Sequence, residues 1–233
     1  MYAAAVGTQK SGGKRIMINI QEALRYAGIV SPDDEMLARM TIIADKLENN
    51  IHPRSVYRVF QIERNEDSIS LSGTPITLHG EMANRMLEGS KHVAVFLCTL
   101  GSQMDQMIRR EVLRDAGEGA LVDACANAYI EAVCDQCEKE IAAIAEGYYL
   151  TDRFSPGYGD LPLDIQPLLL EALNGYRAVG VSIGPSLLMT PMKSVTAMVG
   201  LCETPDIPNV NPCDACLRRE DCTNRIQGRR CHA

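Results

Sequence analysis

The sequence contains no apolar run that is long enough to cross a membrane. Its longest strongly apolar stretch runs from Val93 to Leu100, whereas a membrane helix needs about 20 predominantly apolar residues. The beginning of the chain also lacks the charge order of a secretory signal peptide, because the first basic residue, Lys10, follows the apolar residues Met1 to Val6 instead of preceding them. We therefore expect a cytoplasmic protein with no membrane partner.

Positive charge is in the minority. The chain has 23 Lys and Arg against 30 Asp and Glu, a formal net charge of −7. An excess of negative charge opposes a phosphate backbone, so no nucleic acid partner is expected. The hydrophobic share of 46% and the ordinary glycine and proline contents exclude disordered and collagen-like chains. At about 150 residues per domain, 233 residues predict one large domain or a domain with a short appendage.

The common catalytic signatures are also missing. The sequence has no Walker loop, no Rossmann glycine set, no Ser-His-Asp order and no HExxH motif. The histidines at positions 52, 79 and 92 are scattered without the spacing of metal ligands. No catalytic residue is assigned for these reasons.

The apolar pattern predicts an α+β protein with an antiparallel meander. Residues 1–16 show no periodicity and predict a flexible N-terminal arm, residues 17–202 form the main domain, and residues 203–233 form a cysteine-rich tail. The expected helices cover 19–28, 34–47, 102–115, 118–146 and 165–173, and the expected strands cover 56–78 in short pieces, 92–100 and 193–201. Gly117 and Gly119 are expected to separate the two long helices.

The long helix expected over 118–146 has two different faces. One face is apolar and is expected to meet the core. The other is polar, and its spacing is typical of a solvated helix surface; it carries Asp123, Asn127, Glu131, Asp135 and Glu138. Cys134 and Cys137 lie three residues apart in the same helix and are interpreted as buried small residues.

The segment 153–162, with the sequence RFSPGYGDLP, is too rich in turn-forming residues for a regular element. Gly157 and Gly159 allow backbone amides to approach a ligand closely. Arg153 offers a planar fork that suits a carboxylate, and Tyr158 offers an aromatic face to a cation. A tight surface turn and a loop that holds a small ligand are both compatible with these residues.

RFSPGYGDLP resembles the Arg-x-x-Pro-Gly-Tyr segment of the activation domain of cobalamin-dependent methionine synthase, the domain that binds S-adenosylmethionine. Ser186 to Val195 looks like the Glu-Ser…Met-x-Pro…Ser-Val segment of the same family. The strand VFLCTLG and the helix around Ala128 to Glu131 look like the stand-alone members of the family, which lack a cobalamin module. The resemblance covers about residues 17–202.

The resemblance implies a fold and a set of ligand contacts. The implied fold is a curved antiparallel sheet with packed helices, plus here a small cysteine-rich C-terminal extension. The implied S-adenosylmethionine contacts are Arg153 with the methionine carboxylate, Glu131 near the amino group, a backbone contact at Ser155, and Pro156, Gly157 and Tyr158 shaping the loop. The chain departs from the family at two places, where Gly159-Asp160-Leu161-Pro162 replaces Pro-Ala-Cys-Pro and where Val199 replaces a tyrosine.

The tail has a separate cysteine signature. Four of the nine cysteines fall in the last 21 residues, at Cys213, Cys216, Cys222 and Cys231. An odd, clustered set favours reduced thiols or metal ligands over a disulfide framework. Four thiolates in a compact segment suit a [4Fe–4S] cluster, since zinc ribbons favour two Cys-x2-Cys pairs and this tail has one. Zinc and unligated thiols are the alternatives.

These observations lead to one principal hypothesis and two alternatives. The chain is expected to bind S-adenosylmethionine and to support the reductive methylation of cobalamin on a methionine synthase or related corrinoid protein. In that reaction a Co(II) cobalamin gains one electron and then a methyl group, and the cysteine cluster or another donor supplies the electron. The alternatives are an iron–sulfur electron-transfer protein for another corrinoid partner, and a zinc-stapled docking scaffold that has lost S-adenosylmethionine.

Overall fold

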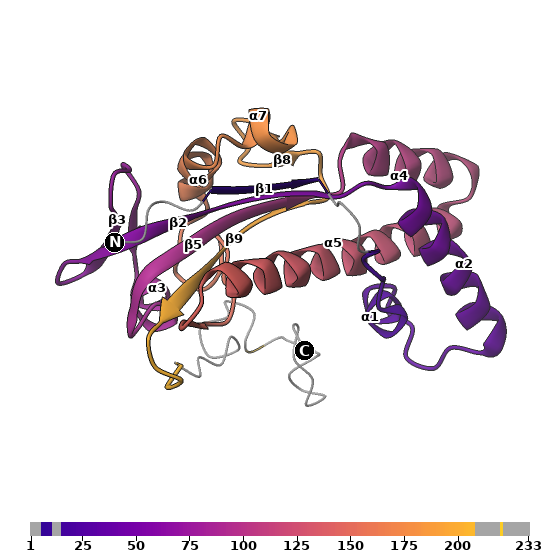
Figure 1. The fold of residues 1–233 in the computed structure, drawn as a ribbon. Coiled ribbons are helices and arrows are strands. Elements are labelled where there is room, and N and C mark those ends of the chain that lie inside the picture. Colours follow the sequence, from indigo (N-terminus) through magenta and orange to yellow (C-terminus); the bar gives the residue numbers. More distant parts are fainter. Residues whose placement is uncertain (1–5, 11–14, 208–219, 221–233) are drawn as a thin grey trace.

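The computed structural model describes residues 6–10, 15–207 and 220. Figure 1 shows one long, curved sheet with α5 along one side and α6 and α7 on the other. The helices are α1 (Ile20–Tyr26), α2 (Asp34–Asn50), α3 (Glu81–Met86), α4 (Ser102–Arg114), α5 (Ala116–Ile144), α6 (Gln166–Ala172) and α7 (Gly175–Val179), with the 3-10 turn η1 (Leu163–Ile165). The strands are β1 (Val6–Lys10), β2 (Arg54–Arg64), β3 (Ser68–Leu71), β4 (Thr77–His79), β5 (Ser90–Thr99), β6 (Tyr149–Leu150), β7 (Ser182–Ile183), β8 (Met189–Thr190) and β9 (Ser194–Cys202).

The main sheet is antiparallel throughout. Its order is β4-β3-β2-β5-β9-β6, with β1 also paired to β2, while β7 and β8 form a separate hairpin. In the centre of the sheet Val95 lies opposite Arg58 on one side and Met198 on the other. The predicted α+β class and antiparallel meander are confirmed.

Strand β5 is covered on both faces, as its apolar sequence predicts. Side chains alternate along a strand, so Ala94 and Phe96 pack into the cluster that includes α5, α1 and α2. Val93, Val95 and Leu97 pack into the second cluster, beneath α3, α6 and α7. The sheet therefore separates two hydrophobic cores, and α5 lies against one of them.

The break between α4 and α5 lies at Asp115, two residues before the predicted glycine break. Asp115 has an extended backbone, and its side chain accepts hydrogen bonds from the amides of Gly117 and Glu118, which caps α5. Gly119 has a packing role instead. A Cβ at this position would lie 2.4 Å from Cγ2 of Val112, so only glycine lets α5 approach α4 this closely.

The expected domain layout includes an N-terminal arm over residues 1–16 and a cysteine-rich tail over residues 203–233. Within the segment expected to be a flexible arm, Val6–Lys10 forms β1, which pairs with β2 from Arg58 to Arg54. Such pairing uses backbone groups and needs no apolar periodicity, which explains why the sequence pattern missed it. The cysteine tail lies outside the described residues, apart from residues 203–207 and 220. No described helix is long and apolar enough to cross a membrane.

Candidate functional site

The segment before the Pro-Gly-Tyr turn runs along the edge of β9. Phe154 and Met198 form a two-way backbone bridge, with N–O distances of 3.0 and 2.8 Å. The Phe154 side chain is buried in the cluster beneath α6. Because neighbouring side chains in an extended segment point to opposite faces, Arg153 is directed toward α5.

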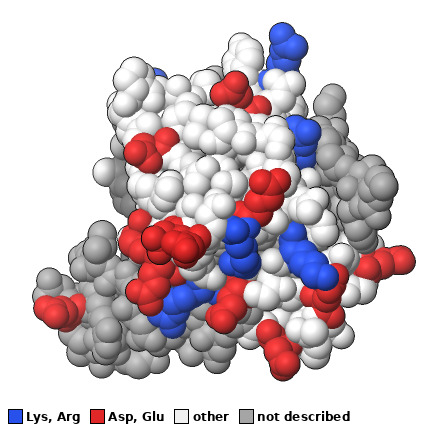
Figure 2. Space-filling view, turned by 90° about the vertical axis from the view of Figure 1, so that its left-hand side faces the viewer, with Lys and Arg blue, Asp and Glu red and all other residues white. Residues whose placement is uncertain are grey.

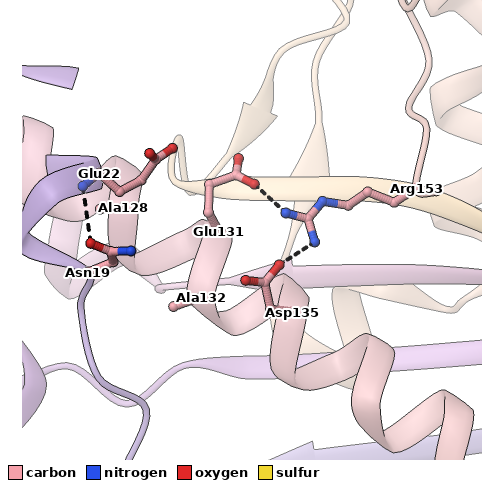
Figure 3. A pocket seen from close by; sticks show the side chains of 7 residues that line it. All are labelled: Asn19, Glu22, Ala128, Glu131, Ala132, Asp135 and Arg153. Atoms are coloured by element: carbon pink, nitrogen blue, oxygen red, sulfur yellow. Dashed lines mark hydrogen bonds and ion pairs between the residues drawn. The ribbon is translucent and has the colours of Figure 1, made fainter. Parts of the chain in front are cut away.

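Three carboxylates of α5 surround the Arg153 guanidinium. Glu131, Asp135 and Glu138 are spaced four and three residues apart, which places them on one helix face. Nη2 of Arg153 lies 2.7 Å from Oε2 of Glu131, and Nη1 lies 2.6 Å from Oδ1 of Asp135 and also contacts Oε1 of Glu138. Figure 3 shows the guanidinium between Glu131 and Asp135. The interpretation of this helix face as merely solvated is wrong here, because a loop from another part of the chain docks on it.

Burial and the neighbouring charges shift two pKa values in this cluster. Burial raises the pKa of Glu138, and repulsion from Asp135 and Glu131 adds to this effect while Arg153 acts against it. Burial is the largest single influence on the pKa of Arg153 and lowers it, but attraction to Glu138 and Cys134 and the hydrogen bonds to Glu138 and Asp135 together outweigh burial and raise the pKa. Arg153 therefore stays charged, and the cluster holds more carboxylate than one guanidinium balances.

A pocket opens beside this cluster, with a volume of about 120 Å³. Its lining residues are Asn19, Glu22, Ala128, Glu131, Ala132, Asp135 and Arg153. In Figure 3 Asn19 and Glu22 come from the start of α1 on one side of Glu131, and Arg153 lies on the other side of Glu131. The small side chains of Ala128 and Ala132 leave the space in front of α5 open.

The residues that the sequence predicts for this site lie in two places. Arg153 and Glu131 meet at the pocket. Ser155, Gly157 and Tyr158 lie beyond Phe154 in a compact turn, and none of them is among the described residues that line this pocket. That turn is closed by hydrogen bonds from the amide of Gly157 to the carbonyl of Leu161 and from the amide of Tyr158 to that of Ser155, at 2.8 and 3.1 Å.

Three polar residues of the pocket, Asn19, Glu22 and Asp135, were not expected as site residues from the sequence. Asn19 caps α1, since its side chain accepts hydrogen bonds from the amides of Gln21 and Glu22. Glu22 lies in the first turn of α1. The signal for Asp135 was available, because it lies four residues after Glu131 on the same face.

A second contact fixes another loop on the same face of α5. Nζ of Lys193 lies 2.9 Å from Oδ1 of Asp123 and 2.6 Å from Oδ1 of Asn127. About one helical turn separates Asn127 from Glu131 of the Arg153 cluster. Val199, which stands where the family has a tyrosine, is fully buried in the core beneath α5 and offers no group to a pocket.

A wider hollow of about 580 Å³ lies elsewhere, where β2 begins and β5 ends. Its lining residues are His52, Pro53, Arg54, Leu100, Gly101, Ser102 and Gln103, and they include none of the predicted site residues. Figure 2 shows another face, on which acidic and basic side chains of the described residues are interspersed. The Arg153 pocket is thus a hollow that two of the predicted residues, Arg153 and Glu131, line.

Comparisons with known proteins add one similarity. No protein-family model matches the chain, and no curated protein matches it. Among solved structures, the chain is similar to one described as the crystal structure of the MetH reactivation domain bound to AdoHcy, with a TM-score of 0.64 and 17% identity, covering 89% of this chain and 80% of that one. The fold implied by the sequence resemblance is thus confirmed: this chain has the fold of the MetH reactivation domain.

Proposed function

We propose that this chain binds S-adenosylmethionine beside Arg153 and supports the reactivation of a cobalamin-dependent methionine synthase or a related corrinoid protein. One observation carries the proposal. Arg153 and Glu131 meet at a pocket, at 2.7 Å, in a chain whose fold matches a reactivation domain that was crystallised with AdoHcy. The methyl donor and the partner's cobalamin supply the chemistry, and this chain supplies binding and orientation.

The charges of the pocket suit the methionine end of S-adenosylmethionine. That end carries a carboxylate, an ammonium group and a sulfonium, so the ligand has a net positive charge. The guanidinium of Arg153 can pair with the carboxylate, and Glu131 and Asp135 can face the two positive groups. Three carboxylates around one guanidinium leave an excess of negative charge that favours such a ligand.

The pocket volume limits what it can hold. Pockets that enclose a whole drug-sized ligand measure roughly 300–1,000 Å³, whereas this pocket measures about 120 Å³. We therefore assign only the methionine end to it. Because Arg153 already contacts three carboxylates, one contact must give way to the ligand. Asp135 is the candidate, since its side chain is 56% exposed and those of Glu131 and Glu138 are about half as exposed.

The docking-scaffold alternative also has structural support. Both terminal nitrogens of the Arg153 guanidinium contact carboxylates of the chain itself, and Val199 cannot replace the family's tyrosine. A chain in which these contacts never open would present the fold without the ligand. The electron-transfer alternative depends on Cys213, Cys216, Cys222 and Cys231, which lie outside the described residues.

Reconstitution with a corrinoid partner tests the proposal. The chain is mixed with a cobalamin-dependent methionine synthase whose own reactivation domain has been removed, held in the Co(II) state, with a strong reductant and S-adenosylmethionine. Recovery of the methylcobalamin spectrum that depends on both the chain and S-adenosylmethionine supports the proposal. Titration calorimetry with S-adenosylmethionine separates the alternatives, because the scaffold predicts no heat of binding.

A further inference from the structure

The segment that departs from the family pattern makes a specific long-range contact. Asp160 follows the Pro-Gly-Tyr turn, where the family has no carboxylate in the resembling segment. Its Oδ2 accepts a hydrogen bond from the amide of Glu81 at 2.6 Å, and its Oδ1 accepts one from the amide of Met82 at 2.9 Å. These two amides open α3, about 80 residues earlier in the chain.

The start of α3 has no other side-chain cap. Gly80 stands at the N-cap position and supplies no side chain, so the first amides of α3 depend on an acceptor from elsewhere. Asp160 provides that acceptor, with one oxygen for each amide. A carboxylate at a helix N-terminus is also favoured by the helix dipole.

Gly80 is fitted to this contact. Its backbone has φ +107°, and a Cβ there would lie 2.7 to 2.8 Å from the three carboxyl atoms of Asp160. Any other residue at this position would be strained and would push Asp160 away. The two residues therefore form one unit, which we call the Gly80–Asp160 contact.

The contact joins the turn to a rigid part of the fold. Met82 and Met86 of α3 are buried in the same cluster as Phe154 and Leu161, which flank the turn. The turn is thus fixed at its near end by the bridge between Phe154 and Met198, and at its far end by Asp160 on α3. Two fixed ends leave Ser155 to Gly159 little freedom to move.

We propose that Asp160 is a positioning residue that holds the turn of Ser155, Gly157 and Tyr158 in its ligand-binding shape. The inference rests on the proposed function together with the sequence resemblance, which implies that this turn contacts S-adenosylmethionine. Asp160 does not touch the ligand; it acts through the turn.

Binding of S-adenosylhomocysteine to the full chain, measured by calorimetry, tests this role. Asp160→Ala should weaken binding about three- to tenfold, the factor that corresponds to losing an external cap of about 1 kcal/mol. Asp160→Asn keeps one acceptor and should have an intermediate effect. Gly80→Ala should act like Asp160→Ala, and the double variant should be no weaker than either, because both changes break one contact. Asp164→Ala, at an exposed position four residues later, is the matched control.

A purely structural role is distinguished by a second readout. Amide hydrogen exchange should show lost protection at Glu81 and Met82 in the Asp160 variants, while the melting temperature of the ligand-free chain changes little more than in Asp164→Ala. Unchanged affinity in Asp160→Ala, with those amides exposed, overturns the inference and leaves the proposed function standing. Absence of binding in the unmodified chain overturns both.

Discussion

Nη2 of Arg153 lies 2.7 Å from Oε2 of Glu131, and this ion pair joins the segment before the Pro-Gly-Tyr turn to the middle of α5. The sequence resemblance assigns these two residues to the two charged groups of the methionine end of S-adenosylmethionine, Arg153 to the carboxylate and Glu131 to the amino group. In the ligand-free chain each group neutralises part of the other. Binding of a zwitterion would give both groups a partner on the ligand, while the more exposed Asp135 releases Arg153.

Replacement of Arg153 tests whether the guanidinium holds the ligand carboxylate. Arg153→Ala should weaken S-adenosylmethionine binding by about 1.5–3 kcal/mol, the usual contribution of a hydrogen bond to a charged group, or roughly ten- to 150-fold. Arg153→Lys should recover part of the loss, because an ammonium keeps the charge but not the planar fork. Titration calorimetry measures both variants.

The control for this experiment is Arg177→Ala, which removes an exposed arginine of α7 on the other side of the sheet. It should bind as the unmodified chain does. Equal affinity in Arg153→Ala and in the control would show that the ligand, if bound, does not use this guanidinium.

The pKa of Glu138 gives a pH-dependent prediction. Burial raises this pKa above 4.5, the ordinary value for Glu, so the folded chain binds a proton more readily than the unfolded chain does. The free energy of unfolding therefore falls as the pH rises from about 4.5 through the raised pKa. Glu138→Gln removes this titration, and the stability of the unmodified chain relative to Glu138→Gln should fall over that pH range.

Urea unfolding of both chains at several pH values between 4.5 and 7.5 measures that difference. The other titrating groups are shared by the two chains and largely cancel. A difference that grows in favour of the unmodified chain as the pH rises would mean that attraction to Arg153 outweighs the burial of Glu138.

The sequence predicted the parts of this site that depend on local pattern. The Pro-Gly-Tyr turn, the long helix and the buried strand β5 follow from turn residues and from apolar spacing within about 30 residues. Arg153 and Glu131 were paired through the family resemblance. The sequence placed Asp135 and Glu138 on the same helix face as Glu131, but it could not show that Arg153 contacts them, since a charged helix face has the same pattern whether water or an arginine meets it.

The contact of Asp160 with α3 was also hidden from the sequence. Its two partners are backbone amides about 80 residues away. Almost every residue has a backbone amide, so the sequence does not show which amides Asp160 binds. In the sequence, Gly80 cannot be distinguished from any other glycine in a turn. Its close approach to Asp160 becomes visible only when the two segments are placed in space.

The close packing of α4 on α5 predicts a costly glycine substitution. Gly119→Ala should destabilise the chain by about 1–3 kcal/mol, because the added Cβ would lie 2.4 Å from Cγ2 of Val112 and 2.7 Å from its backbone. Gly117→Ala, two residues earlier, meets only Oδ1 of Asp115 at 3.2 Å and should cost less. Thermal unfolding of the two variants measures both effects. Equal stability would mean that α4 can move away from α5 freely.

The four tail cysteines predict a metal centre, and this prediction rests on the sequence alone. Between Cys213 and Ala233 the only large aliphatic residues are Leu217 and Ile226, too few to offset the backbone entropy of ordering about 20 residues. Metal–thiolate bonds can supply that free energy, because formation of the site and folding are coupled.

In protein purified without oxygen, iron with a broad visible absorbance would indicate the [4Fe–4S] cluster, and zinc alone would support the docking scaffold. Cys216→Ser should release the metal and make the tail sensitive to protease, while the melting transition of residues 17–202 stays unchanged; a protease-resistant tail without metal, under reducing conditions, would contradict the prediction.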